Sequence, residues 1–459
     1  SAGRRPARSA CGRVRSARVV EDFVICVSTR GKAPAVSLKD AVLAGLAPDG
    51  GLYVPQTIPR LPESWWAALR GKSFHDIAIA IAIELAGDEF DHATITNLVR
   101  EAVNFPVRIV ELEKGLGVLE LFHGPTFAFK DFGARMLARM VGKLQPPLSG
   151  SAAATGGDRR AEGLTVLVAT SGDTGSAVAN AFLGVAGTRV VVLYPEGKLS
   201  PVQEAQFTTL GGNVTSVAVS GTFDDCQRLA KEAFADASLQ SRARLTSANS
   251  ISLGRLLPQV FYYAYAAVQS SAAKQLTVSV PSGNFGNLVA GVIAWKMGAP
   301  LHCFRAPTTI NDTVPRYFAT GRVEPRPSVQ TLANAMDVGN PSNLERLQWL
   351  FNGDLTAMKA VITTSSHTDD EVRKAIAFLY EKYGYLADPH TAIGFLGVPH
   401  KRTGQSLFLA TAHPAKFREV VQPVIKMDIP LPDALAETLH RKKDVQRIRP
   451  ELAELAKLL

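Results

Sequence analysis

Apolar residues in the central part of the chain form short runs, and segments with helical spacing separate these runs. Four runs are rich in Val and Leu and predict buried strands: 164–169, 188–195, 214–219 and 276–283. The segments that follow them predict helices: 176–184, 200–211, 223–234 and 288–298. Continuous apolar strands that alternate with helices indicate parallel sheets whose strands are joined by right-handed crossovers.

The N-terminal part of the chain has a different pattern. Residues 23–31 predict a short strand and a turn, and residues 37–55 predict a helix, a turn and an extended segment. Helical spacing follows up to Val103, so we expect a separate N-terminal domain of residues 23–105. Further along, residues 145–163 are rich in Gly, Ala, Ser and Pro and predict a long surface loop.

Composition and charge bound the possible partners. A chain of 459 residues with 46% apolar composition can bury a large core and form two or three lobes. The net charge is +9, but residues 1–20 contribute six arginines and no acid, so the rest is only mildly basic. We expect no nucleic-acid partner, because no basic stripe with interleaved aromatic residues is present. Residues 1–22 are interpreted as a disordered basic extension; the alternative is a transit peptide, which would place the protein in an organelle.

The four cysteines are scattered and include no CxxC pair, which argues against a zinc site and a disulfide framework. No apolar run reaches the ~18 residues that a membrane span needs. We therefore expect a soluble, cytoplasmic protein with no metal and no membrane partner.

Two strand-to-helix turns have the composition of anion-binding sites. They are TSGDTG, residues 170–175, and SGNFGN, residues 282–287. A helix N-terminus offers unpaired N–H groups and the positive end of the helix dipole, and small residues let an anion approach closely. The hydroxyls of Thr170, Ser171 and Thr174 are further donors. Either turn alone could simply cap a helix, but the pair predicts two anionic groups in one site: a cofactor phosphate, and a substrate phosphate or carboxylate.

Lys130 lies at an apolar turn, in HGPTFAFKDFGAR. The pKa of a lysine at a helix start should be depressed in apolar surroundings, because burial and the helix dipole both disfavour the ammonium form. A neutral amine forms a Schiff base with an aldehyde, and pyridoxal 5′-phosphate (PLP) combines an aldehyde with a phosphate. The alternative is a lysine whose charged end simply reaches solvent. Whether Asp131 opposes the neutral amine depends on where its carboxylate points.

Five motifs together resemble those of the threonine synthase family, in the longer branch found in many bacteria and fungi. They are HGPTFAFKDFGAR (123–135), ATSGDTGSAVANAF (169–182), ANSISLGRLLPQ (248–259), PSGNFGN (281–287) and DPHTAIG (388–394). The resemblance implies PLP fold type II: two α/β lobes with parallel sheets, the cofactor between them, and a smaller N-terminal α+β domain. We accordingly assign residues 106–135 and 246–459 to a large PLP-binding lobe and residues 136–245 to a smaller mobile lobe.

The resemblance also implies residues that hold PLP. Lys130 would form the Schiff base, and the PLP phosphate would lie in a cradle made of Gly283, Asn284, Phe285, Gly286 and Asn287. Asp173 would lie near the ring hydroxyl, where related enzymes often carry Asn. Thr391 would face the pyridine nitrogen, and a hydroxyl there, in place of a carboxylate, would leave this nitrogen largely unprotonated.

The substrate implied by the resemblance is O-phospho-L-homoserine, and the reaction is that of a carbon–oxygen lyase acting on phosphates. The carboxylate of the substrate would bind at Thr170, Ser171, Gly172 and Thr174. Its phosphate would bind at Asn249, Ser250 and Arg255, because a guanidinium offers a forked pair of donors. Lys130 would move protons while phosphate leaves and water adds, which gives threonine. A related lyase or dehydratase that gives 2-oxobutyrate is the alternative, and a dehydratase acting on free threonine needs no phosphate clamp.

Two further expectations concern the whole molecule. The longer branch is usually monomeric, so we expect a monomer. The charged segment 434–459 predicts a helix of unknown role.

Overall fold

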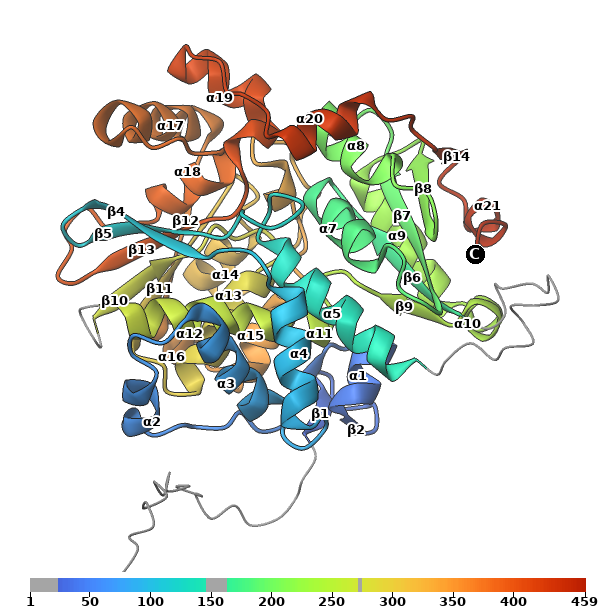
Figure 1. Ribbon diagram of the computed structural model, residues 1–459, viewed down its shortest axis with the longest axis horizontal. Helices are drawn as coiled ribbons and strands as arrows, with labels where there is room; N and C mark the ends of the chain where they lie inside the picture. The colour runs from blue at the N-terminus through green and yellow to red at the C-terminus, as the bar shows by residue number, and fades with distance from the viewer. Residues whose placement is uncertain (1–23, 146–162, 271–274) are drawn as a thin grey trace, which may run out of the picture.

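The computed structural model describes residues 24–145, 163–270 and 275–459. The chain is built around three sheets (Figure 1). The first sheet is small and antiparallel, with the strand order β2 (Val36–Ser37), β1 (Ile25–Ser28) and β3 (Tyr53–Pro55). Four helices accompany it: α1 (Leu38–Ala44), α2 (Glu63–Ala68), α3 (Phe74–Ala86) and α4 (His92–Ala102). The expected α+β architecture of the N-terminal region is confirmed.

The two larger sheets are parallel apart from one edge strand. The six-stranded sheet has the order β12 (Ile362–Ser366), β11 (Leu301–Thr308), β10 (Leu276–Ser279), β13 (Ser406–Ala410), β5 (Leu116–Glu120) and β4 (Arg108–Glu113), and only β4 is antiparallel to its neighbour. The five-stranded sheet has the order β14 (Gln446–Ile448), β8 (Val214–Val219), β7 (Thr188–Pro195), β6 (Leu164–Ala169) and β9 (Leu245–Ser247). The predicted fold class, with two parallel α/β lobes, is confirmed.

The strands β6, β7 and β8 have the limits that the apolar runs predict. β10 ends at Ser279, four residues early, because residues 280–285 already form the turn before the next helix. The helices between strands are α7 (Asp173–Phe182), α8 (Pro201–Thr208), α9 (Phe223–Ala235), α10 (Ala237–Ala243) and α13 (Gly286–Lys296). The predicted loop lies, except for its end residues, outside the described part of the chain, as do residues 1–22.

The prediction of one helix over 434–459 is wrong. The segment forms α20 (Asp433–His440), β14 and α21 (Leu452–Ala456). Pro450 cannot continue a helix, and Ile448 and Leu455 are buried in the core of the five-stranded sheet, where β14 pairs with β8. The range assigned to the large lobe, 246–459, therefore includes a strand of the other sheet.

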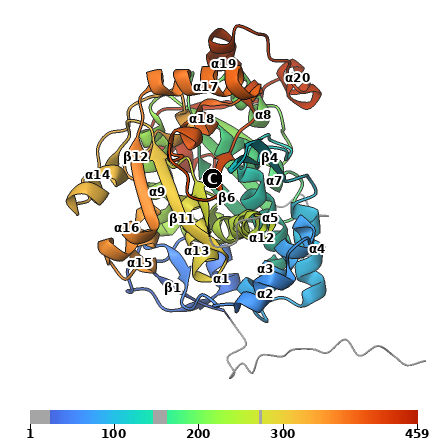
Figure 2. The ribbon, with the colours of Figure 1, turned by 90° about the vertical axis from the view of Figure 1, so that its left-hand side faces the viewer.

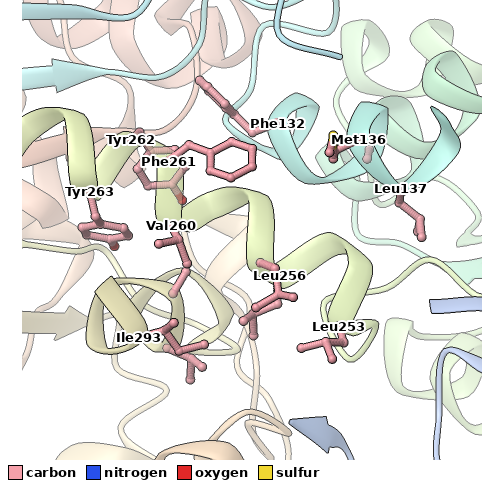
Figure 3. Packing of buried hydrophobic residues seen from close by; sticks show 14 of the residues in the cluster. Phe132, Met136, Leu137, Leu253, Leu256, Val260, Phe261, Tyr262, Tyr263 and Ile293 are labelled. Atoms are coloured by element: carbon pink, nitrogen blue, oxygen red, sulfur yellow. The ribbon is translucent and has the colours of Figure 1, made fainter. Parts of the chain in front are cut away.

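Helix α5 (Lys130–Leu144) connects the N-terminal region and the two lobes. Figure 3 shows how Phe132, Met136 and Leu137 of α5 pack toward α11 (Leu253–Leu256) and α12 (Val260–Gln269). The rings of Phe132 and Tyr262 meet edge to face, with centroids 5.2 Å apart. A side chain at Gly133 would collide with the backbone of Arg255, so the close approach of α5 and α11 requires glycine here. This packing fixes the position of Lys130.

The remaining helices follow β10 along the chain. They are α14 (Thr313–Thr320), α15 (Leu344–Leu350), α16 (Leu355–Val361), α17 (Asp369–Tyr383), α18 (Pro389–Leu396) and α19 (Arg418–Ile425). Three of them contact strands of the six-stranded sheet. In both ribbon views the N-terminal helices lie at the end of the molecule opposite α17 and α19 (Figure 1, Figure 2). No helix within the described ranges has the length and apolar composition needed to cross a membrane.

Candidate active site

Lys130 is the first residue of α5 and its side chain is only 14% exposed. Its Nζ lies 5.0 Å from the centroid of the Phe129 ring. The pKa of the Lys130 amine is lowered to about 8, chiefly by burial; the cations Lys416 and Arg255 add to this lowering, and the carboxylates of Asp173 and Asp388 oppose it. A lowered pKa is what the sequence predicts, and it leaves part of the amine neutral near pH 7.

Asp131 does not oppose this neutrality. Its carboxylate turns back to the preceding turn, where it accepts hydrogen bonds from the Thr126 N–H (2.9 Å) and hydroxyl (2.7 Å). The side chain is fully buried, and burial raises the pKa of the Asp131 carboxyl to about 6. A side chain at Gly124 would collide with this carboxylate, so Gly124 and Asp131 together shape the turn before Lys130.

A second buried lysine, Lys416, lies beside Lys130. It belongs to a short 3-10 turn, Pro414–Phe417, and is fully buried. Its Nζ lies 2.7 Å from Asp173 Oδ1 and donates to the Thr126 carbonyl at 2.9 Å, whereas the Lys130 Nζ lies 3.9 Å from Asp173 Oδ2. Sequence analysis missed Lys416, although its setting in HPAKF, between Ala and Phe, repeats the signal that identified Lys130.

Asp173 is therefore an ionised carboxylate held among cations. Burial alone would raise the pKa of its carboxyl, but Lys416 and Lys130 hold this pKa well below its usual range. The Gln203 amide also donates to Asp173 Oδ1, at 3.1 Å. The structure thus places Asp173 close to Lys130 and adds Lys416 as the nearer partner of this carboxylate.

The turn before α13 is locked into the large lobe. Phe285 has a left-handed backbone (φ 61°), and a side chain at Gly283 would lie 2.6 Å from the Met336 Cα. The Asn284 amide donates to the Ser250 hydroxyl (2.6 Å) and accepts from the Ser342 N–H (2.6 Å). These contacts hold the turn of residues 282–287, called the cup below, in one conformation. Gly286 is the first residue of α13, and the first N–H groups of this helix have no partner within the helix.

Asn287 offers the clearest test of whether this cup fits an anion. Its Oδ1 accepts hydrogen bonds from the hydroxyls of Tyr262 (2.7 Å) and Tyr263 (2.6 Å). These bonds fix the orientation of the amide, and the buried Nδ2 has no partner among the described residues. A buried donor without an acceptor is costly, and a phosphate oxygen would satisfy it. The residues present therefore fit the phosphate of PLP.

The turn before α7 uses part of its polar groups on itself. The buried Thr170 hydroxyl accepts from the Gly172 N–H (2.9 Å) and the Gly175 N–H (2.8 Å) and donates to the Gly172 carbonyl (3.1 Å). Gly172 has φ 139°, and a side chain there would lie 2.7 Å from the Gln203 amide. Ser171 and Thr174 are partly exposed, and no described residue hydrogen-bonds to either hydroxyl. Thr170 and Gly172 thus shape the turn, and Ser171 and Thr174 have hydroxyls free for a ligand.

The residues predicted to bind the substrate phosphate also differ in whether their polar groups are used within the protein or are free for a ligand. The Asn249 amide pairs with the backbone of Ala169, donating to its carbonyl (2.7 Å) and accepting from its N–H (3.3 Å). Arg255 is buried and donates to the Ala248 carbonyl at 2.7 Å, but its Nε has no partner among the described residues. Burial lowers the pKa of Arg255 to about 10. Within the described ranges no carboxylate forms an ion pair with Arg255; Asp131 attracts it from a distance but is hydrogen-bonded to Thr126, so the guanidinium has no anion in contact.

Arg346 is a further residue that sequence analysis missed. Its guanidinium is fully buried and donates to the carbonyls of Tyr53 (2.9 Å), Ser250 (3.2 Å) and Ile251 (2.6 Å), and to the Asn343 amide oxygen (2.8 Å). It therefore joins strand β3 of the N-terminal sheet to the loop that carries Ser250. Burial lowers the pKa of Arg346 to about 9.

The start of α18 is organised by Asp388. Its carboxylate accepts hydrogen bonds from the Thr391 hydroxyl and N–H and from His390 Nδ1 (2.6 Å). His390 Nε2 accepts from the Ala335 N–H at 3.2 Å, which places a ring proton on Nδ1, where it faces Asp388. The Thr391 hydroxyl has already donated its proton to Asp388 and has only lone pairs to offer a ligand.

Comparisons with known proteins agree with this geometry. Three family models match successive parts of the chain: threonine synthase N terminus over residues 26–103, pyridoxal-phosphate dependent enzyme over residues 106–407, and threonine synthase, C-terminal, over residues 391–459. The threonine synthase of Haemophilus influenzae is 44% identical over 87% of this chain and 91% of its own length.

Solved structures are similar over almost the whole chain. The threonine synthase of Escherichia coli has a TM-score of 0.86 and 38% identity, and the match covers 95% of this chain and 99% of that one. The PLP-bound threonine synthase of Brucella melitensis also has a TM-score of 0.86, with 36% identity and coverage of 95% and 98%. The chain therefore belongs to the threonine synthase family of pyridoxal-phosphate-dependent enzymes.

Proposed function

We propose that the protein converts O-phospho-L-homoserine and water into L-threonine and inorganic phosphate, with PLP as its cofactor. Membership of the family supports the reaction, and one observation supports the phosphorylated substrate. Arg255 is a buried cation without a carboxylate partner among the described residues, and it is close enough to lower the pKa of Lys130. A buried charge requires a counter-ion, and a substrate phosphate would supply one.

We propose that Lys130 holds PLP covalently and that the cup before α13 holds its phosphate, with the free Nδ2 of Asn287 as one donor. When bound, PLP supplies an aldehyde that reacts with the substrate amine and a ring that withdraws electrons from the substrate. Thr391 would face the ring nitrogen. Because its hydroxyl donates to Asp388, Thr391 would offer the nitrogen lone pairs but no negative charge to hold a proton there.

The substrate would be oriented by groups that keep hydrogen-bonding capacity beyond their bonds within the protein. Ser171 and Thr174 would bind its carboxylate, and Arg255 and Ser250 would bind its phosphate, while Thr170, Gly172 and Asn249 shape the two loops. The neutral Lys130 amine would take the Cα proton and then a Cβ proton. Phosphate would leave Cγ with the electrons of the C–O bond; protons at Cγ and Cα and a hydroxide at Cβ would complete threonine.

Water must stay away from the reacting carbons until phosphate has left, since early protonation or hydration would give other products. We propose that the site lies between the two lobes and that their closure excludes water. We also propose that the protein acts in the cytoplasm as a monomer, which sedimentation equilibrium would test for its oligomeric state.

The deciding experiment incubates the purified protein with O-phospho-L-homoserine, with and without PLP. We expect phosphate and threonine in equal amounts, and only with PLP. Release of 2-oxobutyrate in place of threonine would support the related lyase. Lys130→Ala should bind PLP without a covalent adduct, and Lys143→Ala, an exposed lysine on the same helix, is the matched control. A covalent adduct that persists in Lys130→Ala would overturn the role of Lys130.

A further inference from the structure

Lys416 is a buried cation that the proposed reaction does not use. Its Nζ is fully enclosed, yet it belongs to a short turn that follows β13 rather than to the helices that carry the substrate-binding hydroxyls. Only two groups among the described residues contact its ammonium: the Asp173 carboxylate at 2.7 Å and the Thr126 carbonyl at 2.9 Å. Burying an ammonium is costly, so a residue that only fills space here would be apolar.

Asp173 stands between two lysines and is bound unequally by them. One oxygen, Oδ1, is in contact with Lys416, and the other, Oδ2, lies 3.9 Å from the Lys130 Nζ. The carboxylate is 2% exposed, so water does not screen either attraction effectively. Without Lys416, the nearest cation to this buried carboxylate would be Lys130, and a close ion pair would hold Lys130 in its protonated form.

We propose that Lys416 is a positioning residue for the reaction: its ammonium binds the Asp173 carboxylate and so leaves the Lys130 amine free to react with an aldehyde. The proposal rests on Lys130 being the residue that holds PLP. The anchor for the arrangement is the Thr126 carbonyl, since Thr126 also binds Asp131 and lies in the turn that places Lys130 at the start of α5. One turn therefore positions both lysines.

The charges that act on Lys130 predict in which direction each substitution changes its pKa. Asp173 and Asp388 favour its ammonium form, whereas Lys416 and Arg255 disfavour it. Removal of Lys416 should raise the pKa of Lys130, because one opposing cation is lost and Asp173 is released. Removal of the Asp173 charge should lower this pKa, because Lys416 and Arg255 then act with less opposition. Removal of both Lys416 and the Asp173 charge should leave the pKa of Lys130 near its wild-type value, because the two shifts have opposite signs.

The test measures the protonation of Lys130 directly in the full chain freed of PLP. Acetic anhydride acetylates neutral amines, and mass spectrometry of the Lys130 peptide gives the extent of labelling between pH 6 and 10. The wild-type midpoint is expected near pH 8. We expect Lys416→Met to raise the midpoint by ~1 pH unit or more, with ~10-fold less labelling at pH 7. Asp173→Asn should lower it, and the double variant should return toward the wild type.

Lys143→Met, an exposed lysine of α5, is the matched control and should leave the midpoint unchanged. The proposal is overturned if Lys416→Met leaves the midpoint in place, or if the double variant stays as high as Lys416→Met. Circular dichroism reports whether each variant folds. If Lys416→Met does not fold, Asp173→Asn decides the matter, and the absence of a downward shift overturns the proposal.

This readout is independent of the proposed function, since it needs neither PLP nor substrate. A covalent PLP adduct that persists in Lys130→Ala would remove the role of Lys130 but leave the labelling profile intact. A second measurement links the two: the rate at which each variant binds PLP covalently, followed by absorbance, should order the variants as the labelling midpoints do.

Discussion

The two anion-binding turns share a backbone plan but differ in what their side chains do. Each joins a parallel strand to a helix through small residues. The turn before α13 contains no acid, is locked by Asn284, and presents an amide donor without a described partner. The turn before α7 contains Asp173. The Thr170 hydroxyl forms hydrogen bonds with the backbone of this turn, and the hydroxyls of Ser171 and Thr174 have no described partner. The same backbone conformation can thus form two kinds of site. The turn before α13 is rigid and suits a phosphate, whereas the turn before α7 has free hydroxyls and a carboxylate that a lysine must neutralise.

The largest effect is expected at Gly283 in the turn before α13, where there is no space for a side chain. In Gly283→Ala the new methyl group would lie 2.6 Å from the Met336 backbone, so the turn must move. We expect ~100-fold weaker PLP binding and a loss of ~1–3 kcal/mol in the free energy of unfolding. PLP titration and urea unfolding measure the two effects. Gly142→Ala, where the methyl group meets only the end of the Val185 side chain, is the control. Unchanged PLP affinity in Gly283→Ala would show that the cup is not rigid.

Asn287 allows ligand binding and stability to be separated. Asn287→Ala removes the phosphate donor and the acceptor shared by two buried tyrosine hydroxyls; Tyr262 can still donate to Gln259 Oε1 (3.1 Å), but Tyr263 has no other acceptor among the described residues. We expect ~10- to 100-fold weaker PLP binding and a stability loss of ~2–4 kcal/mol. The same change in a protein that also carries Tyr262→Phe and Tyr263→Phe should recover stability but not PLP affinity. Recovery of both would mean that Asn287 acts only through the tyrosines.

The Lys130 amine, which lies beside the α7 turn, should make the covalent binding of PLP depend on pH. The Lys130 amine must be neutral to react, and its pKa lies at about 8, so the reactive fraction grows as pH rises through this value. We expect the rate of covalent PLP binding to increase ~10-fold from pH 7 to pH 9 and then to level off. Stopped-flow absorbance gives this profile. A rate that is flat over this range would contradict a titrating Lys130.

The smallest effects should distinguish the two kinds of hydroxyl in the α7 turn. Thr170→Val deprives two N–H groups of their acceptor and should cost ~1–3 kcal/mol of stability. Ser171→Ala should leave stability unchanged and raise KM several-fold, by about 1 kcal/mol of binding. Thermal unfolding and steady-state kinetics make the comparison. An unchanged KM in Ser171→Ala would remove this hydroxyl from the substrate site.

The parts of this structure that sequence predicts are those decided by neighbours in sequence. The strands β6, β7 and β8 are apolar runs bounded by turn residues, and Lys130 is marked by the aromatic residues before it. Lys416 and Arg346 are different, because their partners lie far away along the chain: Thr126 is 290 residues from Lys416, and Tyr53 is 293 residues from Arg346. Nothing local distinguishes Arg346 from an ordinary surface cation, and the apolar neighbours of Lys416 suggest burial without showing which groups it binds.

The C-terminal segment fails as a prediction for the same reason. Its helical spacing is real in α20 and α21, but Ile448 becomes a strand residue only because the edge of β8 is available to it. Thr170 and Asn249 show the converse case. Their types suit a substrate site, but nearby backbone groups use their hydrogen bonds, and only the folded loop reveals this.

The pairing of β14 with β8 also imposes an order on biosynthesis. The chain makes β8 first, then the strands β10 to β13 of the other sheet, and only afterwards the residues that cover the β8 edge. During translation the five-stranded sheet therefore waits with one edge open, and open edges are where chains associate wrongly. β14 leaves the ribosome after every other described strand, and it completes a sheet whose other strands were made before most of the second lobe. The folding of the five-stranded sheet is therefore completed only after the six-stranded sheet has been synthesised.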